Sequence, residues 1–196
     1  GVQIKKTKKI KKTIVLLSVI ACLVIGGIAA FYADKEAKTN VFTVGSVSID
    51  LVEPNWDEDN IKDGMMPNET VPKDPYVINN GLNDAFIYMS VIVPYKDMQI
   101  QDMTGAITDV EDHEVFAYET NGDWVLVESV KDETNEVMKH IYAYVGDDDS
   151  TLETLAPNGT TPTIFDEIQF ANVASDQGLE GTELDVIVNA YAIQTE

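Results

Sequence analysis

The stretch AFIYMSVIVPY, at residues 85–95, has the strongest strand character in this chain of 196 residues. Its β-branched and aromatic residues are the types that fit the pleated surface of a sheet. Apolar residues occupy both of its alternating faces, which indicates a strand that is covered from both sides. We therefore expect this segment to be a central strand, with the rest of the fold built outward from it.

Other segments before and after this stretch also have the character of strands. At residues 46–51, apolar and polar residues alternate, which is the pattern of a half-buried strand. The dipeptide Asn121-Gly122 is a strong hairpin signal between two such segments. The expected strands besides residues 85–95 are residues 41–52, 76–80, 115–119, 124–130, 137–145, 151–155, 183–194 and 163–170, the last of which could instead be a helical turn.

These strands, and the turns between them, predict an all-β fold. No helical periodicity occurs after the N-terminal region. The predicted class is an antiparallel sandwich of two sheets or a jelly roll. About 165 residues are enough for one sizeable core, so we expect a single domain at residues 41–196 behind a polar linker at residues 30–40.

The N-terminal region has a different character. Six lysines between residues 5 and 12 precede a run of 20 uncharged, mostly apolar residues at 14–33. As a helix this run would be roughly 30 Å long, enough to cross the hydrocarbon core of a membrane. Because the lysines stay on the cytoplasmic side, the rest of the chain is expected to be exported. Contact with a membrane is expected only through residues 14–33.

Three interpretations of this apolar run remain open. Its small residues favour a signal peptide at residues 1–29 that is cut between Ala29 and Ala30. Its length favours a retained membrane anchor. The sequence before Cys22 loosely fits a lipoprotein signal, although a lipidated chain would then begin with further apolar residues. The cleaved signal peptide is the leading interpretation.

The charge of the exported part excludes some classes of partner. All 34 acidic residues and seven of the 13 lysines follow the apolar run, so this part carries a formal charge of −27. Nucleic acids and anionic lipid surfaces attract basic patches, so neither is an expected partner. Solubility alone explains the acidity, and the uptake of cations is the alternative. Since the one cysteine, Cys22, precedes the exported part, no disulfide is expected there.

No catalytic motif stands out in the sequence. The two histidines, His113 and His140, do not form the H-E-x-x-H pattern of a zinc peptidase, and no G-x-S-x-G pattern occurs. We interpret His113 as a residue of a surface loop at 111–114 and His140 as a residue on one face of a strand. Carboxylate pairs of the glycosidase type remain open, because such pairs are recognised by geometry.

Two acidic segments are candidates for binding calcium, because hard cations prefer oxygen ligands. Neither has the spacing of an EF-hand loop, and solvated acidic loops are the leading interpretation. The candidate calcium ligands are Asp57, Asp59, Asp63, Asp147, Asp148 and Asp149. No other cofactor is expected.

Several segments carry a resemblance to a known family. The sequence GGIAAF at residues 26–31, followed by VFTVGSVSIDL at residues 41–51, resembles the start of proteins in the TasA and camelysin group. Phe31 and Asp34 take the places of the aromatic residue and the acid near the cleavage site, and residues 42–45 take the place of an F-x-x-G pattern. Also similar are PKDPYVINNGLNDAFI at residues 72–87 and AYAIQT at residues 190–195.

The resemblance implies a jelly-roll-like sandwich and a secreted protein of the cell surface or biofilm matrix of a Gram-positive bacterium. A signal peptidase of the SipW type would be its processing partner. The resemblance also implies self-assembly into fibres, or assembly with other matrix proteins. In such fibres the N-terminal segment of one subunit, here residues 30–52, completes a sheet of the next.

Some members of this group are named as peptidases. This sequence lacks the metal motif that would support that activity, so we do not expect an enzyme. Two alternatives to a structural protein remain open: a secreted metallopeptidase of the camelysin type, and a monomeric surface module that binds calcium or a glycan.

Overall fold

The computed structural model describes residues 40–44, 47–56, 65–147, 151–175, 177–179, 182 and 184–195. The chain divides into two units, Gly1–Lys38 and Thr39–Glu196, and the described residues all belong to the second. The predicted signal peptide and its cleavage position at Ala29 and Ala30 lie outside the described residues, as does nearly all of the predicted linker. The described residues include no helix with the length and hydropathy of a membrane span.

The described part of the chain is all-β, as the sequence predicts, and its strands form three sheets. The main sheet has the order β1-β12-β5-β9-β8, and β6 and β10 also pair with β5. The two small sheets have the orders β3-β11-β7 and β2-β4. The strands are β1 (Asn40–Val44), β2 (Ile49–Val52), β3 (Thr70–Pro72), β4 (Tyr76–Asn79), β5 (Ala85–Met98), β6 (Glu111–Glu114), β7 (Phe116–Ala117), β8 (Trp124–Asp132), β9 (Val137–Tyr144), β10 (Thr154–Leu155), β11 (Glu167–Phe170) and β12 (Ile187–Gln194).

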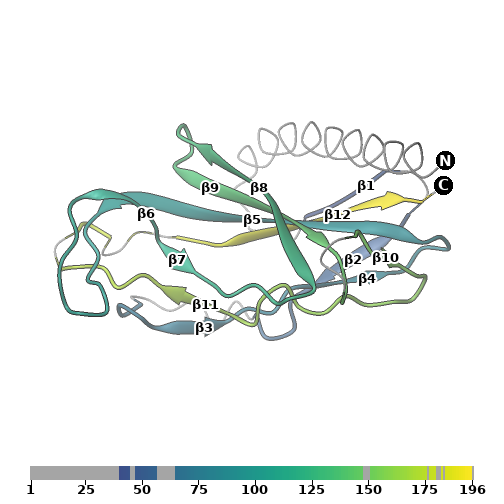
Figure 1. The fold of residues 1–196 in the computed structure, drawn as a ribbon, viewed down its shortest axis with the longest axis horizontal. Coiled ribbons are helices and arrows are strands. Elements are labelled where there is room, and N and C mark those ends of the chain that lie inside the picture. The colour runs from purple at the N-terminus through teal and green to yellow at the C-terminus, as the bar shows by residue number, and fades with distance from the viewer. Residues whose placement is uncertain are drawn as a thin grey trace, which may run out of the picture. The chain divides into compact units, whose positions relative to one another are not determined.

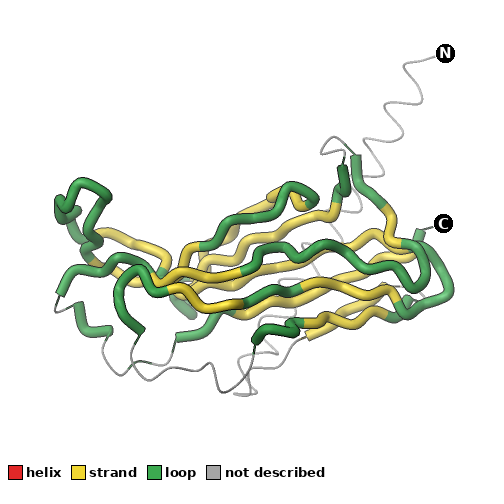
Figure 2. Tube along the Cα trace, turned by 90° about the horizontal axis from the view of Figure 1, so that it is seen from below, coloured by secondary structure: helices red, strands yellow, loops and turns green. Residues whose placement is uncertain are grey.

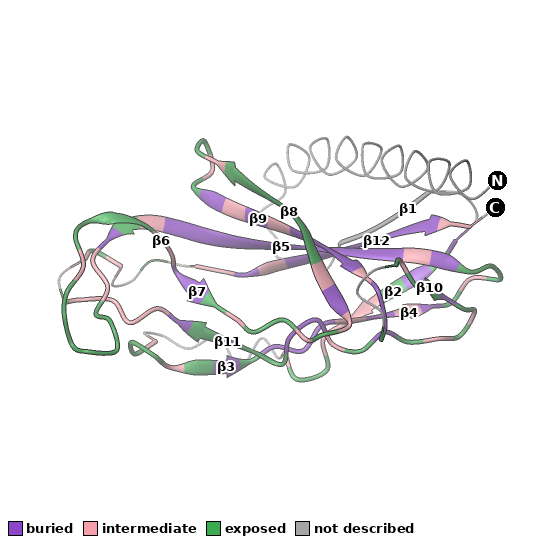
Figure 3. Ribbon diagram, viewed as in Figure 1, coloured by how far each residue is buried: buried purple, intermediate pink, exposed green. Residues whose placement is uncertain are grey.

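Strand β5 is the centre of the main sheet, which confirms the prediction made from residues 85–95. It is 14 residues long and lies between β12 and β9, antiparallel to both. Every residue from Ile87 to Tyr95 is buried. Figure 3 shows β5 as an almost continuous buried ribbon, whereas most of β8 is exposed.

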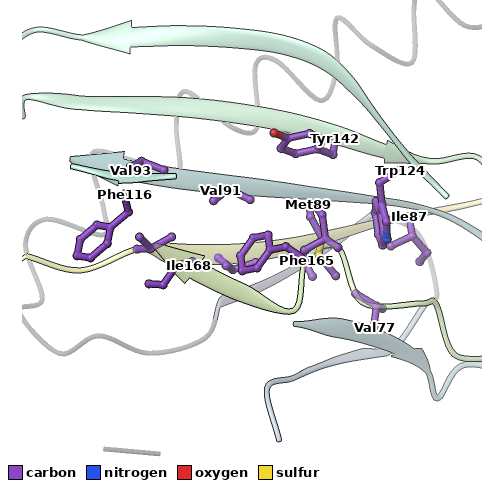
Figure 4. Close-up of a cluster of buried hydrophobic side chains, with 14 of the residues drawn as sticks. Val77, Ile87, Met89, Val91, Val93, Phe116, Trp124, Tyr142, Phe165 and Ile168 are labelled. Atoms are coloured by element: carbon purple, nitrogen blue, oxygen red, sulfur yellow. The ribbon is translucent and has the colours of Figure 1, made fainter. Parts of the chain in front are cut away.

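The two small sheets lie on one side of the main sheet, so the described strands form two layers (Figure 1; Figure 2 shows the strands from below). The hydrophobic core fills the space between the layers. Alternate residues of β5, from Ile87 to Val93, form one wall of this core. The opposite wall includes Val77 of β4, Ile168 of β11, and Phe165 in the segment just before β11 (Figure 4).

The second layer differs from the prediction, because it consists of two small sheets where one was expected. Pro72 ends β3, and Pro75 comes just before β4. Proline has no backbone N–H and cannot donate to a ladder of hydrogen bonds. A continuous strand through residues 70–79 is therefore not formed, and the chain changes sheets between the two prolines.

The strand predicted at residues 41–52 is in fact two strands in two different sheets. β1 pairs in parallel with β12 at an edge of the main sheet. β2 pairs antiparallel with β4. The alternation of residues 46–51 indicates a strand, but it carries no information about where the chain leaves one sheet for another.

The hairpin predicted at Asn121-Gly122 is wrong. A turn is present, closed by a hydrogen bond of 3.1 Å from the Trp124 amide to the Asn121 carbonyl. However, β7 before the turn pairs with β11, and β8 after it pairs with β9. The Asn121 side chain donates to the Thr163 carbonyl of the second layer at 2.8 Å, so this turn connects the two layers.

The loop predicted around His113 is also wrong, because residues 111–114 form strand β6. Their partner is the far end of β5, which continues beyond Pro94 to Met98. Pairing with a long neighbouring strand overrides the low β-propensity of this polar segment. Strands β10, β11 and β12 occupy only the later parts of their predicted ranges.

Candidate functional site

Most of the predicted calcium ligands lie outside the described residues, namely Asp57, Asp59, Asp63, Asp148 and Asp149. Asp147 is described and is exposed in the turn after β9. Within the described ranges, no three His, Cys, Asp or Glu side chains lie close enough together to hold a metal ion. The calcium site therefore stays a prediction.

The two histidines have different surroundings. His140 lies on β9, as predicted, and is 13% exposed. His113 lies on β6, next to Glu114 in sequence, so the two side chains point to opposite faces of that strand. Nε2 of His113 is buried, and no described atom is hydrogen-bonded to it. The two histidines consequently do not share a site through β6.

Side chains from two other strands contact His140 of β9. The Ser129 hydroxyl of β8 lies 2.8 Å from Nδ1 of His140. The carboxylate of Glu114 on β6 lies on the other side of the ring, with both oxygens 3.0 Å from Nε2. We call Ser129, His140 and Glu114 the serine–histidine–glutamate array.

A β-bulge in β8 places Ser129 in this array. Leu126 lies opposite Tyr142, but the register then shifts, so that Glu128 lies opposite Ile141 and Ser129 opposite His140. The extra residue is Val127. Without it, the regular antiparallel register would put Glu128 opposite His140. A bulge re-aims the side chains that follow it, and here it brings a hydroxyl to the imidazole.

Aromatic rings pack against the array on its core side. The ring of Tyr118 meets the His140 ring edge to face, with 6.4 Å between their centroids. The Tyr118 hydroxyl is 2.9 Å from the Tyr142 hydroxyl, and its ring lies 4.7 Å from that of Phe165. Burial, together with the hydrogen bond to Tyr142, raises the pKa of Tyr118. These contacts fix the plane of the His140 ring.

The hydrogen bonds of the array define the role of each atom. A carboxylate can only accept, so Nε2–H of neutral His140 donates to Glu114. Nδ1 is then the acceptor, and it accepts the Ser129 hydroxyl proton. A nucleophile next to a base, with the base oriented by a third group, is the arrangement of nucleophilic catalysis. Sequence reasoning missed it, since the bulge that creates it has no recognisable sequence signal.

A second polar cluster joins the loop after β2 to the segment between β3 and β4. Lys73 is 3% exposed, and its Nζ lies 3.1 Å from a Glu53 oxygen and 4.0 Å from the centroid of the Trp56 ring. Asp74 accepts hydrogen bonds from both the amide and the side chain of Asn55. Lys73 and Glu53 form an ion pair and Asp74 is hydrogen-bonded to Asn55, so these contacts join the two segments.

Comparison with known proteins adds a family relationship. The family model described as camelysin metallo-endopeptidase matches residues 4–186, a range that includes the whole serine–histidine–glutamate array. No curated protein and no solved structure matches the chain.

Proposed function

Because the chain belongs to the camelysin metallo-endopeptidase family, whose members are exported surface proteins, we propose that it is a structural protein of the cell surface or biofilm matrix. In this proposal it assembles into fibres through its N-terminal strand. The fold of each subunit is a jelly-roll-like sandwich that gives one strand to the next subunit and receives one from the subunit before it.

The place of β1 is the observation that carries this proposal. β1 lies at one edge of the main sheet, and β12 is its partner among the described strands, in parallel over residues Asn40 to Val44. The next strand, β2, belongs to a different sheet. β1 is therefore an edge strand of the main sheet, and the chain leaves that sheet directly after it. We call β1 an exchangeable arm. Such an arm can be replaced by the same arm of another copy, because the same ladder forms in either case.

In this proposal a neighbour receives a shorter segment than the resemblance to the family implies. Resemblance to the family implied residues 30–52 as the donor, but β2 is paired with β4, and Ile49 is buried in the core of its own chain. Exchange of β2 would open that core. The donor in this proposal is therefore the part of the chain before residue 45. Because donor and acceptor are different surfaces, the contact does not close on itself and an open filament grows.

The donor atoms of the described residues do not fit the metal ion that the family description implies. His140 and Glu114 supply ligands from two side chains, whereas a catalytic zinc takes three protein ligands. No group of three potential ligands occurs in the described part of the chain. A metallopeptidase is therefore the second candidate, and these residues supply no step for it.

Export and processing complete the proposal. A signal peptidase of the SipW type removes residues 1–29 by cutting between Ala29 and Ala30, and the product is released to the cell surface or matrix. The charge of −27 after the apolar run keeps this product soluble before it assembles. If the run is retained instead, the protein is a membrane-anchored surface domain.

Assembly of two purified forms tests the role of β1. A chain that begins at Ala30 is expected to form fibres, and one that begins at Gly45 is expected to stay monomeric because it has no donor strand. Electron microscopy and sedimentation measure the difference. A synthetic peptide of residues 30–44 should bind the shorter form at the vacant edge of β12, while a peptide of scrambled sequence should not. Fibres formed equally by both chains would show that the proposal is wrong.

A further inference from the structure

We propose that Ser129, His140 and Glu114 form a serine-type acyl-transfer site that acts on small esters with an apolar acyl group. This activity is additional to fibre formation and does not depend on it. Ser129 is the nucleophile, His140 the general base, and Glu114 a positioning residue that acts through His140.

The distances suit these roles. Ser129 Oγ lies 2.8 Å from His140 Nδ1, within reach for direct transfer of a proton. Both oxygens of Glu114 lie 3.0 Å from Nε2, so the carboxylate holds the ring in the tautomer whose Nδ1 is free to accept that proton. The Tyr118 ring restricts His140 from the core side. The base is thus held by two contacts and is only 13% exposed, while Ser129 itself is exposed to substrate.

The surface around Ser129 indicates the class of substrate. β8 is paired with β9 on one side only among the described strands, so it presents unpaired backbone groups along its free edge. No described strand covers this edge beside Ser129, so a small ester can reach its hydroxyl. Leu126 lies opposite Tyr142, on the same face of the sheet as Ser129 and His140, and is 50% exposed. This side chain favours an apolar acyl group next to the nucleophile.

The reaction balances with water as the only other reactant. Ser129 Oγ forms a bond to the ester carbonyl carbon, and its proton passes to Nδ1 of His140. The bond between the carbonyl carbon and the alcohol oxygen breaks, and the alcohol leaves with that proton. Water then gives a proton to His140 and attacks the acyl-serine, which releases the acid and restores the Ser129 hydroxyl.

Labelling with an alkyl fluorophosphonate tests the proposal in the full chain, purified in detergent. The phosphorus bonds to Oγ and fluoride leaves, so peptide mass spectrometry identifies the modified serine. We expect Ser129 to be modified at least 100-fold faster than Ser48, an exposed serine of the same chain that serves as internal control. Equal rates at the two serines would overturn the proposal.

Variants separate catalysis from a merely structural contact. His140→Gln is expected to lower the rate at Ser129 to that of Ser48, and Ser129→Ala to abolish hydrolysis of 4-nitrophenyl butyrate by the same preparation. Since Ser129 is exposed, its alanine variant should keep the melting temperature of the parent chain. Ester hydrolysis that persists unchanged in Ser129→Ala would also overturn the proposal.

The role of Glu114 is tested through the rate at which Ser129 is labelled, because a purely structural role would not change this rate. Glu114→Gln is expected to slow labelling of Ser129 about tenfold, because the amide no longer selects one tautomer of His140. Glu114→Asp keeps the carboxylate and should recover part of the rate. If both variants label Ser129 at the parent rate, Glu114 has no positioning role and the assigned mechanism is wrong.

Discussion

The two edges of the main sheet are built differently. At one edge, β1 is joined to β12 by a parallel ladder of five residue pairs. At the other edge, β8 is nine residues long, pairs antiparallel with β9 and contains a bulge at Val127. Lys131 of β8 is also ion-paired with Asp112 of β6, and it lies over the ring of Tyr95.

This difference indicates which edge takes part in the proposed assembly. A bulge and charged side chains keep a second strand from pairing with an edge, and β8 has both. Parallel pairing is slightly weaker per residue than antiparallel pairing, and β1 has only five residues in its ladder. The β1 edge is therefore suited to exchange between copies, and the β8 edge stays accessible to small molecules.

An exchangeable β1 requires a hydrophobic core that stays folded without it. A substitution that leaves a cavity in the core gives a reference value for the stability that β1 contributes. Phe165 is fully buried between the two layers. Phe165→Ala is expected to lower the free energy of unfolding by about 3–5 kcal/mol, measured by denaturant titration of the monomer. Starting the chain at Gly45 should cost clearly less. A loss as large as that of Phe165→Ala would mean that β1 is integral to the core and cannot be exchanged.

The β8 side of the sheet also contains a buried charge. Lys139 of β9 lies opposite Val130 of β8, and burial lowers its pKa from 10.5 to about 8. Between these two values the unfolded chain binds more protons than the folded chain, so the contribution of Lys139 to stability rises with pH from about 8 to 10.5.

Lys139→Met should remove this pH dependence. Relative to the parent chain, the free energy of unfolding of the variant should be higher at pH 7 than above pH 10.5 by up to about 3 kcal/mol. Thermal unfolding of both chains from pH 7 to 11 measures the difference. Fibre formation should be unchanged, since the substitution lies away from the β1 edge. A gain that is the same at every pH would contradict the cause assigned here.

A matched pair of lysines tests the charge at the β8 edge. Lys131 on β8 and Lys96 on β5 are similarly exposed, and each is ion-paired, with Asp112 and Glu136 respectively. Replacing either by valine should change the free energy of unfolding little, because exposed ion pairs contribute little to stability. Only Lys131→Val, at the edge, should increase self-association in sedimentation velocity. Equal association in both variants would mean that the lysine does not protect this edge.

The sequence predicted those parts of the fold whose signal is local. Residues 85–95 are apolar on both faces, and they form the central strand β5. The resemblance in residues 26–51 and 72–87 identified the family that the family model matches. Both conclusions depend on residues that are close together in the sequence.

What the sequence could not predict depends on pairing between distant segments. Nothing at Asn121-Gly122 distinguishes a hairpin from a turn that connects two layers, because the difference lies in the partners of β7 and β8. The serine–histidine–glutamate array was missed for the same reason. Ser129 meets His140 through a shift in register, and Glu114 meets it because β6 pairs with the end of β5.

Cross-linking between copies tests the exchange of β1 most directly. Thr43 lies opposite Ala192 in the register of β1 and β12, and neighbouring strands are close enough for a disulfide. Two chains beginning at Ala30, one with Thr43→Cys and one with Ala192→Cys, are mixed, assembled and oxidised. We predict disulfide-linked pairs of the two chains in fibres and none in monomers. Fibres that form without this cross-link, while a chain carrying both substitutions cross-links only within itself, would contradict the account.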